Sequence, residues 1–313
     1  MRGSVLVIDP AAELFRERLG AAFPGVKVNA VPDIGRGRAF AADTEVMFGM
    51  PRAFDEAMLR AAEGLRWIQA GTVGTDFLVR IPGLRPDTLI TSTRGIHGPQ
   101  MAEMALLLMM ALGRRLPKCL ENQRQHLWQR PEQRRLFGKT VVIVGIGQSG
   151  GQLGVLCKAL GMHVIGVSAR GQAPGFDRVV PRSQLMDVIP EAHFVVLVLP
   201  YDASSHHLIN EKVLNAMRPD AVLVNIARGG VIDEPALIEA LKAKRIAGAA
   251  LDVASKEPLP PESPLWALDN VIITPHAAGE CEEYHELALE VFAKNLRCYL
   301  EGRTSDMINL VKR

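Results

Sequence analysis

The stretch Val141-Val142-Ile143-Val144-Gly145-Ile146-Gly147-Gln148-Ser149-Gly150-Gly151 decides the fold of this chain. Four consecutive apolar residues predict a strand buried on both faces, and a G-x-G-x-x-G pattern follows at once. We expect Gly145 to permit a tight turn, Gly147 to let a pyrophosphate approach the backbone, and Gly150 to allow close helix–strand packing. Between a strand and a helix, this motif predicts dinucleotide binding. The alternative is a glycine-rich turn without a ligand.

Strand-like runs alternate with helical segments on both sides of this motif. Such alternation predicts parallel sheets, because parallel strands need a helical crossover. The fold class we expect is α/β, with two Rossmann-like or flavodoxin-like lobes, each a doubly wound parallel sheet. An apolar helix near Met101–Leu112 is expected to bridge the lobes. The predicted strands are Val5–Ile8, Val26–Val31, Glu45–Phe48 and Arg66–Gln69, then six more at Val141–Val144, His163–Val167, Phe194–Leu199, Ala221–Asn225, Ala247–Asp252 and Val271–Thr274, with helices at Ser149–Leu160 and Cys281–Leu300.

Composition excludes several classes of function. The 313 residues suit about two domains, and 48% hydrophobic with 22% charged residues is typical of a globular chain. With 36 basic and 34 acidic residues and no basic tract, neither nucleic acid nor a membrane is an expected partner. Four widely spaced cysteines predict free thiols in a reducing cytoplasm. We expect no metal site, since the adjacent His206 and His207 cannot converge on one ion without further ligands.

The end of the second predicted strand of the nucleotide lobe bears on the choice of coenzyme. An acidic residue would bind the ribose 2′-OH there, but the chain continues Ser168-Ala169-Arg170, and the next carboxylate is Asp177. Ser168 can donate to a 2′-phosphate and Arg170 can pair with it. The pattern therefore favours NADP over NAD, unless Arg170 is only a solvated loop charge.

At this point the chain resembles the D-isomer-specific 2-hydroxyacid dehydrogenases over nearly its whole length. The motifs that carry the resemblance occur in the family's order, and the last three each place one ionisable residue after a predicted strand. They are Ala70-Gly71-Thr72-Val73-Gly74-Thr75-Asp76, Gly95-Ile96-His97-Gly98-Pro99-Gln100-Met101-Ala102-Glu103, Asn225-Ile226-Ala227-Arg228-Gly229-Gly230-Val231-Ile232-Asp233, Ala250-Leu251-Asp252-Val253-Ala254-Ser255-Lys256-Glu257-Pro258-Leu259-Pro260 and Asn270-Val271-Ile272-Ile273-Thr274-Pro275-His276-Ala277-Ala278-Gly279.

The resemblance implies that Arg228, Glu257 and His276 are catalytic, and the chemistry of these groups fits. A protonated His276 can give a proton to a carbonyl oxygen, and Glu257 would orient the ring and favour its cationic form. Arg228 offers a fork of donors to a substrate carboxylate. By analogy, Val73 and Gly74 would bind that carboxylate through backbone N–H groups, together with Arg228 and His276. Implied coenzyme-binding residues are Gly145, Ile146, Gly147, Gln148, Ser149, Gly150, Ser168, Arg170, Leu199, Pro200, Ile226, Ala227, Arg228, Asp252, His276 and Gly279.

The resemblance also implies a domain organisation and an activity. Residues 1–95 with 281–313 would form a discontinuous substrate lobe, and residues 96–280 the dinucleotide-binding lobe, with a closable cleft between them. We expect an NADPH-preferring reductase of a small 2-oxo acid, glyoxylate or hydroxypyruvate, that dimerises through the cofactor lobe. Phe48 and Met50 would either line the pocket or pack in the core. The alternative to a reductase is a dinucleotide-sensing co-repressor-like binding protein of the same fold.

Overall fold

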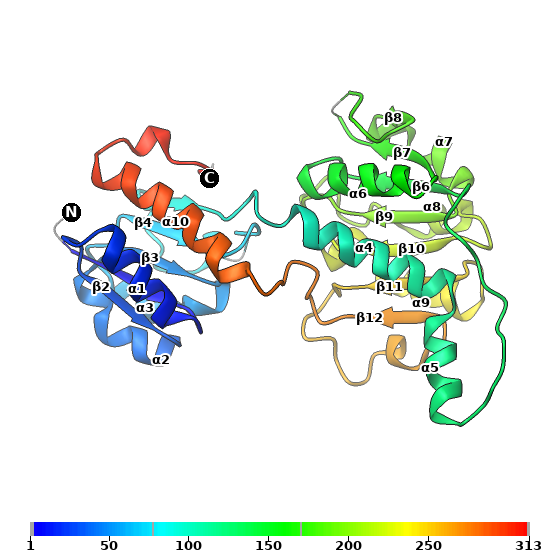
Figure 1. Cartoon of the computed structure of the whole chain (residues 1–313), viewed down its shortest axis with the longest axis horizontal. Coiled ribbons are helices and arrows are strands. Elements are labelled where there is room, and N and C mark those ends of the chain that lie inside the picture. The colour runs from blue at the N-terminus through cyan, green and yellow to red at the C-terminus, as the bar shows by residue number, and fades with distance from the viewer. Residues whose placement is uncertain (1–2, 77, 170, 312–313) are drawn as a thin grey trace. The chain divides into compact units, whose positions relative to one another are not determined.

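The computed structural model describes residues 3–76, 78–169 and 171–311 and divides the chain into two compact units (Figure 1). The first unit comprises Met1–Ile96 and Cys281–Arg313, and the second comprises His97–Glu280. Each unit contains one parallel sheet with helices, which confirms the expected α/β class. In the described part of the chain, no helix is long and apolar enough to cross a membrane. The cleft between lobes stays a prediction.

The sheet of the second unit has seven strands within the described residues, in the order β12-β11-β10-β9-β6-β7-β8. The chain reverses its direction of progress across the sheet between β6 and β9, and ligands of such sheets bind outside the carboxyl ends at this switch point. The sequence predicted six of these strands and missed the three-residue edge strand β8. The strands are β6 (Thr140–Val144), β7 (His163–Val167), β8 (Arg178–Val180), β9 (Phe194–Leu197), β10 (Val222–Asn225), β11 (Gly248–Leu251) and β12 (Val271–Ile273).

Apolar runs form the central strands of this sheet because both of its faces are covered. Val142 and Val144 of β6 pack into one hydrophobic cluster, while Val141 and Ile143 pack into a second cluster on the other face. Successive side chains of a strand point to opposite faces, so a strand buried on both sides must be apolar at every position. The four side chains are at most 1% exposed.

Helices cover the two faces of this sheet (Figure 1). The predicted apolar helix is α4, which begins directly after the boundary between the units and belongs to the second unit. Its bridging of the two lobes stays a prediction. Its small residues Ala102 and Ala105 are fully buried in the cluster that also contains Leu153 of α6. The helices of the second unit are α4 (Gly98–Gly113), α5 (Leu116–Arg124), α6 (Gln148–Ala159), α7 (Leu185–Val188), α8 (Glu211–Ala216) and α9 (Glu234–Lys242).

The first unit contains a five-stranded parallel sheet in the order β2-β1-β3-β4-β5, the flavodoxin-like arrangement. The sequence missed its short fifth strand. The C-terminal helix α10 starts at Tyr284, three residues later than predicted, and packs its Phe292 into the same core as Phe15 and Phe48. The elements are β1 (Ser4–Ile8), α1 (Ala12–Ala22), β2 (Val28–Val31), α2 (Ile34–Gly37), β3 (Thr44–Gly49), α3 (Glu56–Ala61), β4 (Trp67–Ala70), β5 (Leu89–Thr91) and α10 (Tyr284–Leu300).

Candidate active site

The glycine loop joins β6 to α6 at the switch point of the second sheet. Gly145 has a φ of +102°, which favours glycine, and a Cβ there would lie 2.5 Å from the carbonyl oxygen of Val198. A Cβ on Gly150 would lie 1.9 Å from the carbonyl oxygen of Gly145, so only glycine lets helix and turn meet. Gly147, by contrast, has open space where its Cβ would be. The chain thus leaves room for a ligand at the N-terminus of α6, where backbone N–H groups favour an anion such as a pyrophosphate.

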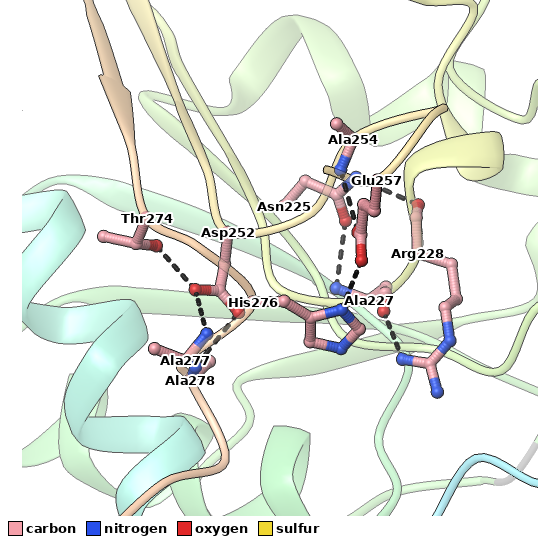
Figure 2. A network of polar contacts seen from close by, with 10 residues as sticks. All are labelled: Asn225, Ala227, Arg228, Asp252, Ala254, Glu257, Thr274, His276, Ala277 and Ala278. Carbon is pink, nitrogen blue, oxygen red and sulfur yellow. Dashed lines mark hydrogen bonds and ion pairs between the residues drawn. The ribbon is translucent and has the colours of Figure 1, made fainter. Parts of the chain in front are cut away.

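Four polar side chains predicted as site residues follow the carboxyl ends of neighbouring strands. Arg228 comes after β10, Asp252 and Glu257 come after β11, and His276 comes after β12. Because β10, β11 and β12 are adjacent and parallel, these side chains lie at one edge of the sheet (Figure 2). Open α/β sheets bind their ligands at this edge.

His276 and Glu257 form a hydrogen-bonded pair. Nδ1 of His276 lies 2.7 Å from Oε2 of Glu257, and Oε1 of Glu257 accepts the backbone N–H of Ala254 at 3.1 Å (Figure 2). Burial alone would raise the pKa of Glu257, but the bonds from His276 and Ala254, with the positive charges of His276 and Arg228, hold it below the ordinary value. The carboxylate therefore stays ionised and engages Nδ1, which leaves Nε2 as the nitrogen that can exchange a proton with a substrate.

Arg228 is held beside this pair by the turn after β10. The fully buried Asn225 accepts the N–H of Ala227 at 3.0 Å through Oδ1 and donates through Nδ2 to the carbonyl of Arg228 at 3.0 Å. Nη1 of Arg228 donates to the carbonyl of Ala227 at 2.8 Å, and its charge lowers the pKa of Glu257. Sequence reasoning gave Asn225 no role. The available signal was an asparagine at the end of a predicted apolar strand, because asparagine side chains often form hydrogen bonds with the backbone of a following turn.

Asp252 organises the loop that carries His276. Its carboxylate is 2% exposed and accepts the hydroxyl of Thr274 and the N–H groups of Ala277 and Ala278, at 2.5, 2.9 and 3.0 Å (Figure 2). Its backbone carbonyl also accepts the N–H of His276 at 2.8 Å. These bonds satisfy a buried carboxylate and hold His276 at a φ of +55°. Thr274 is a second positioning residue that the sequence did not reveal.

The structure locates most of the other predicted coenzyme-binding residues, except Arg170, which lies outside the described residues. Ser168 follows β7, and its N–H donates to the carbonyl of Val180 at 2.9 Å. Asp177 lies at the opposite end of β7, where it accepts the N–H of Val164 at 2.8 Å and pairs with Lys158. No carboxylate from Asp177 therefore reaches the carboxyl end of β7. The side chains of Ile146, Leu199, Ile226 and Ala227 are buried, whereas Gln148 and Pro200 are exposed and Ser149 and Gly279 are partly exposed.

In the first unit, the predicted carboxylate-binding turn follows β4. Val73 is 42% exposed, and the turn is tied down where Gly71 donates to the carbonyl of Gly49 and Thr93 donates to that of Thr72. Phe48 is fully buried and belongs to the core. Met50 is only partly buried, and its Sδ accepts the hydroxyl of Tyr284 at 3.5 Å.

The histidine pair His206 and His207 stacks ring on ring, with centroids 3.9 Å apart. The hydroxyl of Tyr201 is 2.8 Å from Nδ1 of His206. Among the residues that the structure describes, no group of three potential metal ligands gathers here or elsewhere.

A switch-point glycine loop and a histidine–carboxylate pair beside an arginine define a class of protein: a dinucleotide-dependent oxidoreductase. Comparison with known proteins narrows this class. Residues 106–278 match the NAD binding domain of the D-isomer specific 2-hydroxyacid dehydrogenases. The chain belongs to this family and is, at family level, an NAD(P)-dependent oxidoreductase acting on a CH–OH group.

Relatives with curated names support the same assignment. A glyoxylate reductase of Korarchaeum cryptofilum is 32% identical over 255 residues, which cover 79% of this chain and 77% of that protein. A D-3-phosphoglycerate dehydrogenase of Methanocaldococcus jannaschii is 32% identical over 264 residues, and these span 80% of this chain but only 48% of that protein.

Solved structures share the fold. A D-isomer specific 2-hydroxyacid dehydrogenase family protein from Aeromonas salmonicida has a TM-score of 0.90 at 31% identity, covering 100% of this chain and 99% of that one. A D-isomer specific 2-hydroxyacid dehydrogenase from Xanthobacter autotrophicus, in complex with NADPH and MES, has a TM-score of 0.84 at 27% identity, covering 100% and 98%.

Proposed function

We propose that this protein reduces a small 2-oxo acid, glyoxylate or hydroxypyruvate, to the D-2-hydroxy acid with NADPH. The observation that carries the proposal is the 2.7 Å bond between His276 and Glu257 beside the charge of Arg228. Names of relatives support the substrate class, since the Korarchaeum cryptofilum protein is a glyoxylate reductase.

The residues of the site divide the work of this reaction. The coenzyme, when bound, supplies the hydride that goes to the carbonyl carbon. His276 gives the Nε2 proton to the carbonyl oxygen, and Glu257 holds the ring and stabilises its cationic form. Arg228 binds the substrate carboxylate and draws electron density from the carbonyl. In the oxidative direction neutral His276 accepts the proton.

Binding of the two substrates is assigned to the two units. The second unit, His97–Glu280, would bind the coenzyme, as predicted for residues 96–280, and the open space at Gly147 supports this because it suits the pyrophosphate. The first unit would bind the substrate carboxylate through the N–H groups of Val73 and Gly74. Asp252 would accept from the nicotinamide carboxamide with its remaining lone pairs, beside the backbone of Ile226, Ala227 and Gly279.

The preference for NADPH rests on the end of β7. Ser168 lies there without a neighbouring carboxylate from Asp177, and Arg170 follows two residues later. The Xanthobacter autotrophicus relative, which binds NADPH, supports the same choice. The ratio of kcat/KM for NADPH to that for NADH should exceed one, and Arg170→Ala should reduce it; an unmodified enzyme that prefers NADH would contradict this choice.

The experiment that tests the function is a substrate panel on the purified protein. We expect NADPH oxidation with glyoxylate and hydroxypyruvate, faster than with longer 2-oxo acids. Tight NADPH binding without turnover of any 2-oxo acid would favour the alternative, a dinucleotide-sensing co-repressor-like binding protein.

We also propose a homodimer that forms through the second unit. Its helices α4 and α5 leave apolar side chains in solvent: Leu107 and Met110 are 55% and 38% exposed, and Leu120 is 44% exposed. Trp128, in the segment after α5, is 97% exposed. Such a surface suits a second copy of the chain. Sedimentation should show a dimer that Leu107→Asp or Trp128→Asp dissociates.

A cytoplasmic location stays a prediction, supported by the four free cysteines.

A further inference from the structure

A pocket lies at the end of the second sheet opposite to the candidate active site. Its floor includes Phe194 and Val222, the first residues of β9 and β10, so it opens at the amino ends of the strands. The triad follows the carboxyl ends of β10, β11 and β12, and the strands are parallel. Gly113 at the end of α4 lies over Phe194 and completes the wall. The proposed reaction therefore does not use this pocket.

Positive charge predominates in this pocket, which we call the basic pocket. Four cationic side chains line it, namely Arg115, Arg134, Arg135 and Lys139, against the single carboxylate of Asp220 among the described lining residues. Asp220 is already paired with Arg218 at 2.8 Å. No ion pair involves any of the four cations within the described residues. Because the chain as a whole has 36 basic and 34 acidic residues, this excess is local rather than compositional.

Two of the cations are held by contacts other than ion pairs, although the charge of Arg134 also acts on the carboxylate of Asp220 and lowers its pKa. Arg134 donates through Nη1 to the backbone carbonyl of Asp220, and its own N–H donates to the carbonyl of Gly113 at 2.8 Å. The guanidinium of Arg135 lies 5.5 Å from the ring centroid of Phe137. A guanidinium held in this way offers preoriented N–H donors to an oxyanion.

His193 adds a neutral donor to the same pocket. Its Nδ1 accepts the backbone N–H of Thr140 at 3.2 Å, so the proton of the neutral ring belongs on Nε2. Burial lowers the pKa of His193, and the charges of Arg218, Lys139 and Arg134 lower it further, against the opposing charge of Asp220. The pKa of His193 therefore reports the electrostatic potential in the pocket.

We propose that this basic pocket binds a tetrahedral phosphate dianion, either free phosphate or the phosphate group of a small phosphomonoester. Several oxygens on one compact dianion can engage a guanidinium, the Lys139 ammonium and Nε2 of His193 together, which one planar carboxylate cannot do as completely. Binding would link the end of α4 and the segment before β6 to the sheet, and would stabilise the second unit. The inference does not depend on the identity of the 2-oxo acid.

The test uses His193 as a local reporter in the full-length protein. Its pKa is measured by NMR in chloride and in inorganic phosphate at equal ionic strength, with the signal assigned by its loss in His193→Gln. We expect phosphate to raise this pKa and to raise Tm, because the dianion stabilises the protonated ring. Phosphate bound at the glycine loop would leave the pKa of His193 unchanged, because His193 lies at the opposite end of the sheet.

Matched variants separate a built site from general attraction. Arg135→Gln with Lys139→Gln should weaken phosphate binding at least about tenfold, whereas Arg130→Gln, in the same exposed segment, should leave it unchanged. Lys139→Gln alone replaces the double variant if that protein does not fold. Glycerol 3-phosphate is titrated in parallel, and the tighter ligand identifies the source of the phosphate. An unchanged pKa of His193 in phosphate, or equal binding by the double variant, would overturn the proposal.

Discussion

The imidazole of His276 and the carboxylate of Glu257 meet at 2.7 Å although 19 positions separate them in the chain. The two strands that precede them, β12 and β11, are neighbours in the sheet, so the pairing follows from the register of the strands and not from local sequence. Arg228, after the next strand, contributes its charge to the same carboxylate. The catalytic proposal therefore rests on three adjacent strand ends.

Replacing His276 removes the proposed proton donor. We expect His276→Asn to lower kcat/KM for glyoxylate reduction by about 10²–10⁴-fold. Asparagine tolerates the φ of +55° that His276 adopts, so the backbone should persist. A Tm close to that of the unmodified protein should show that the fold persists in this variant. Undiminished turnover in this variant would refute the assignment of His276 as the acid.

Glu257→Gln tests the pair through the proton-transfer step. Glutamine keeps the size of the side chain but removes the negative charge beside Nδ1 of His276, so kcat for reduction should fall at least about tenfold while KM for NADPH stays unchanged. Parallel losses in kcat and in NADPH binding would indicate a purely structural role.

Glu257 also makes the stability of the protein depend on pH in the acidic range. The pKa of Glu257 in the folded protein is lowered, so its stabilising contribution is present above the ordinary carboxyl pKa of 4.5. This contribution disappears as the pH falls through the lower folded value. Urea unfolding of Glu257→Gln should therefore differ from that of the unmodified protein near neutral pH and approach it in acid. A difference in unfolding free energy that grows toward low pH would contradict this prediction.

Two glycines of the β6–α6 turn give opposite predictions. Gly150→Ala places a Cβ 1.9 Å from a backbone carbonyl oxygen and should cost about 3 kcal/mol of stability or prevent folding. Gly147→Ala meets no atom within 4 Å, so Tm should hardly change. We expect this second variant to bind NADPH at least about tenfold more weakly, since the methyl occupies the space left for the pyrophosphate. Normal NADPH affinity would show that the space serves another purpose.

The buried carboxylate of Asp252 should matter more for stability than any one of its donors. Asp252→Asn turns an N–H donor toward the N–H of Ala277 or Ala278, and should destabilise the protein by about 2–3 kcal/mol. Thr274→Val removes one donor only and should cost about 1 kcal/mol. Urea denaturation measures both losses of stability. Equal losses would contradict the larger role of Asp252, which accepts three hydrogen bonds (Figure 2).

The sequence by itself determined the strand–glycine–helix turn, the α/β class and the identity of the ionisable residues after the strands. These are local properties: an apolar run, a backbone that only glycine allows and a residue at a strand end are all read within about ten positions. The short strands β8 and β5 were missed because each has only two consecutive apolar residues, whereas the equally short β12 has three and was predicted.

Only the tertiary structure decided which side chains meet. Strand order brings Arg228, Glu257 and His276 to one edge, and the same order gathers Arg115, Arg134 and Lys139 at the other. The roles of Asn225 and Thr274 also appeared only there, because a buried hydrogen bond depends on which backbone groups the fold places opposite a side chain. Long-range pairing of strands, and not the spacing of residues along the chain, fixes these neighbours.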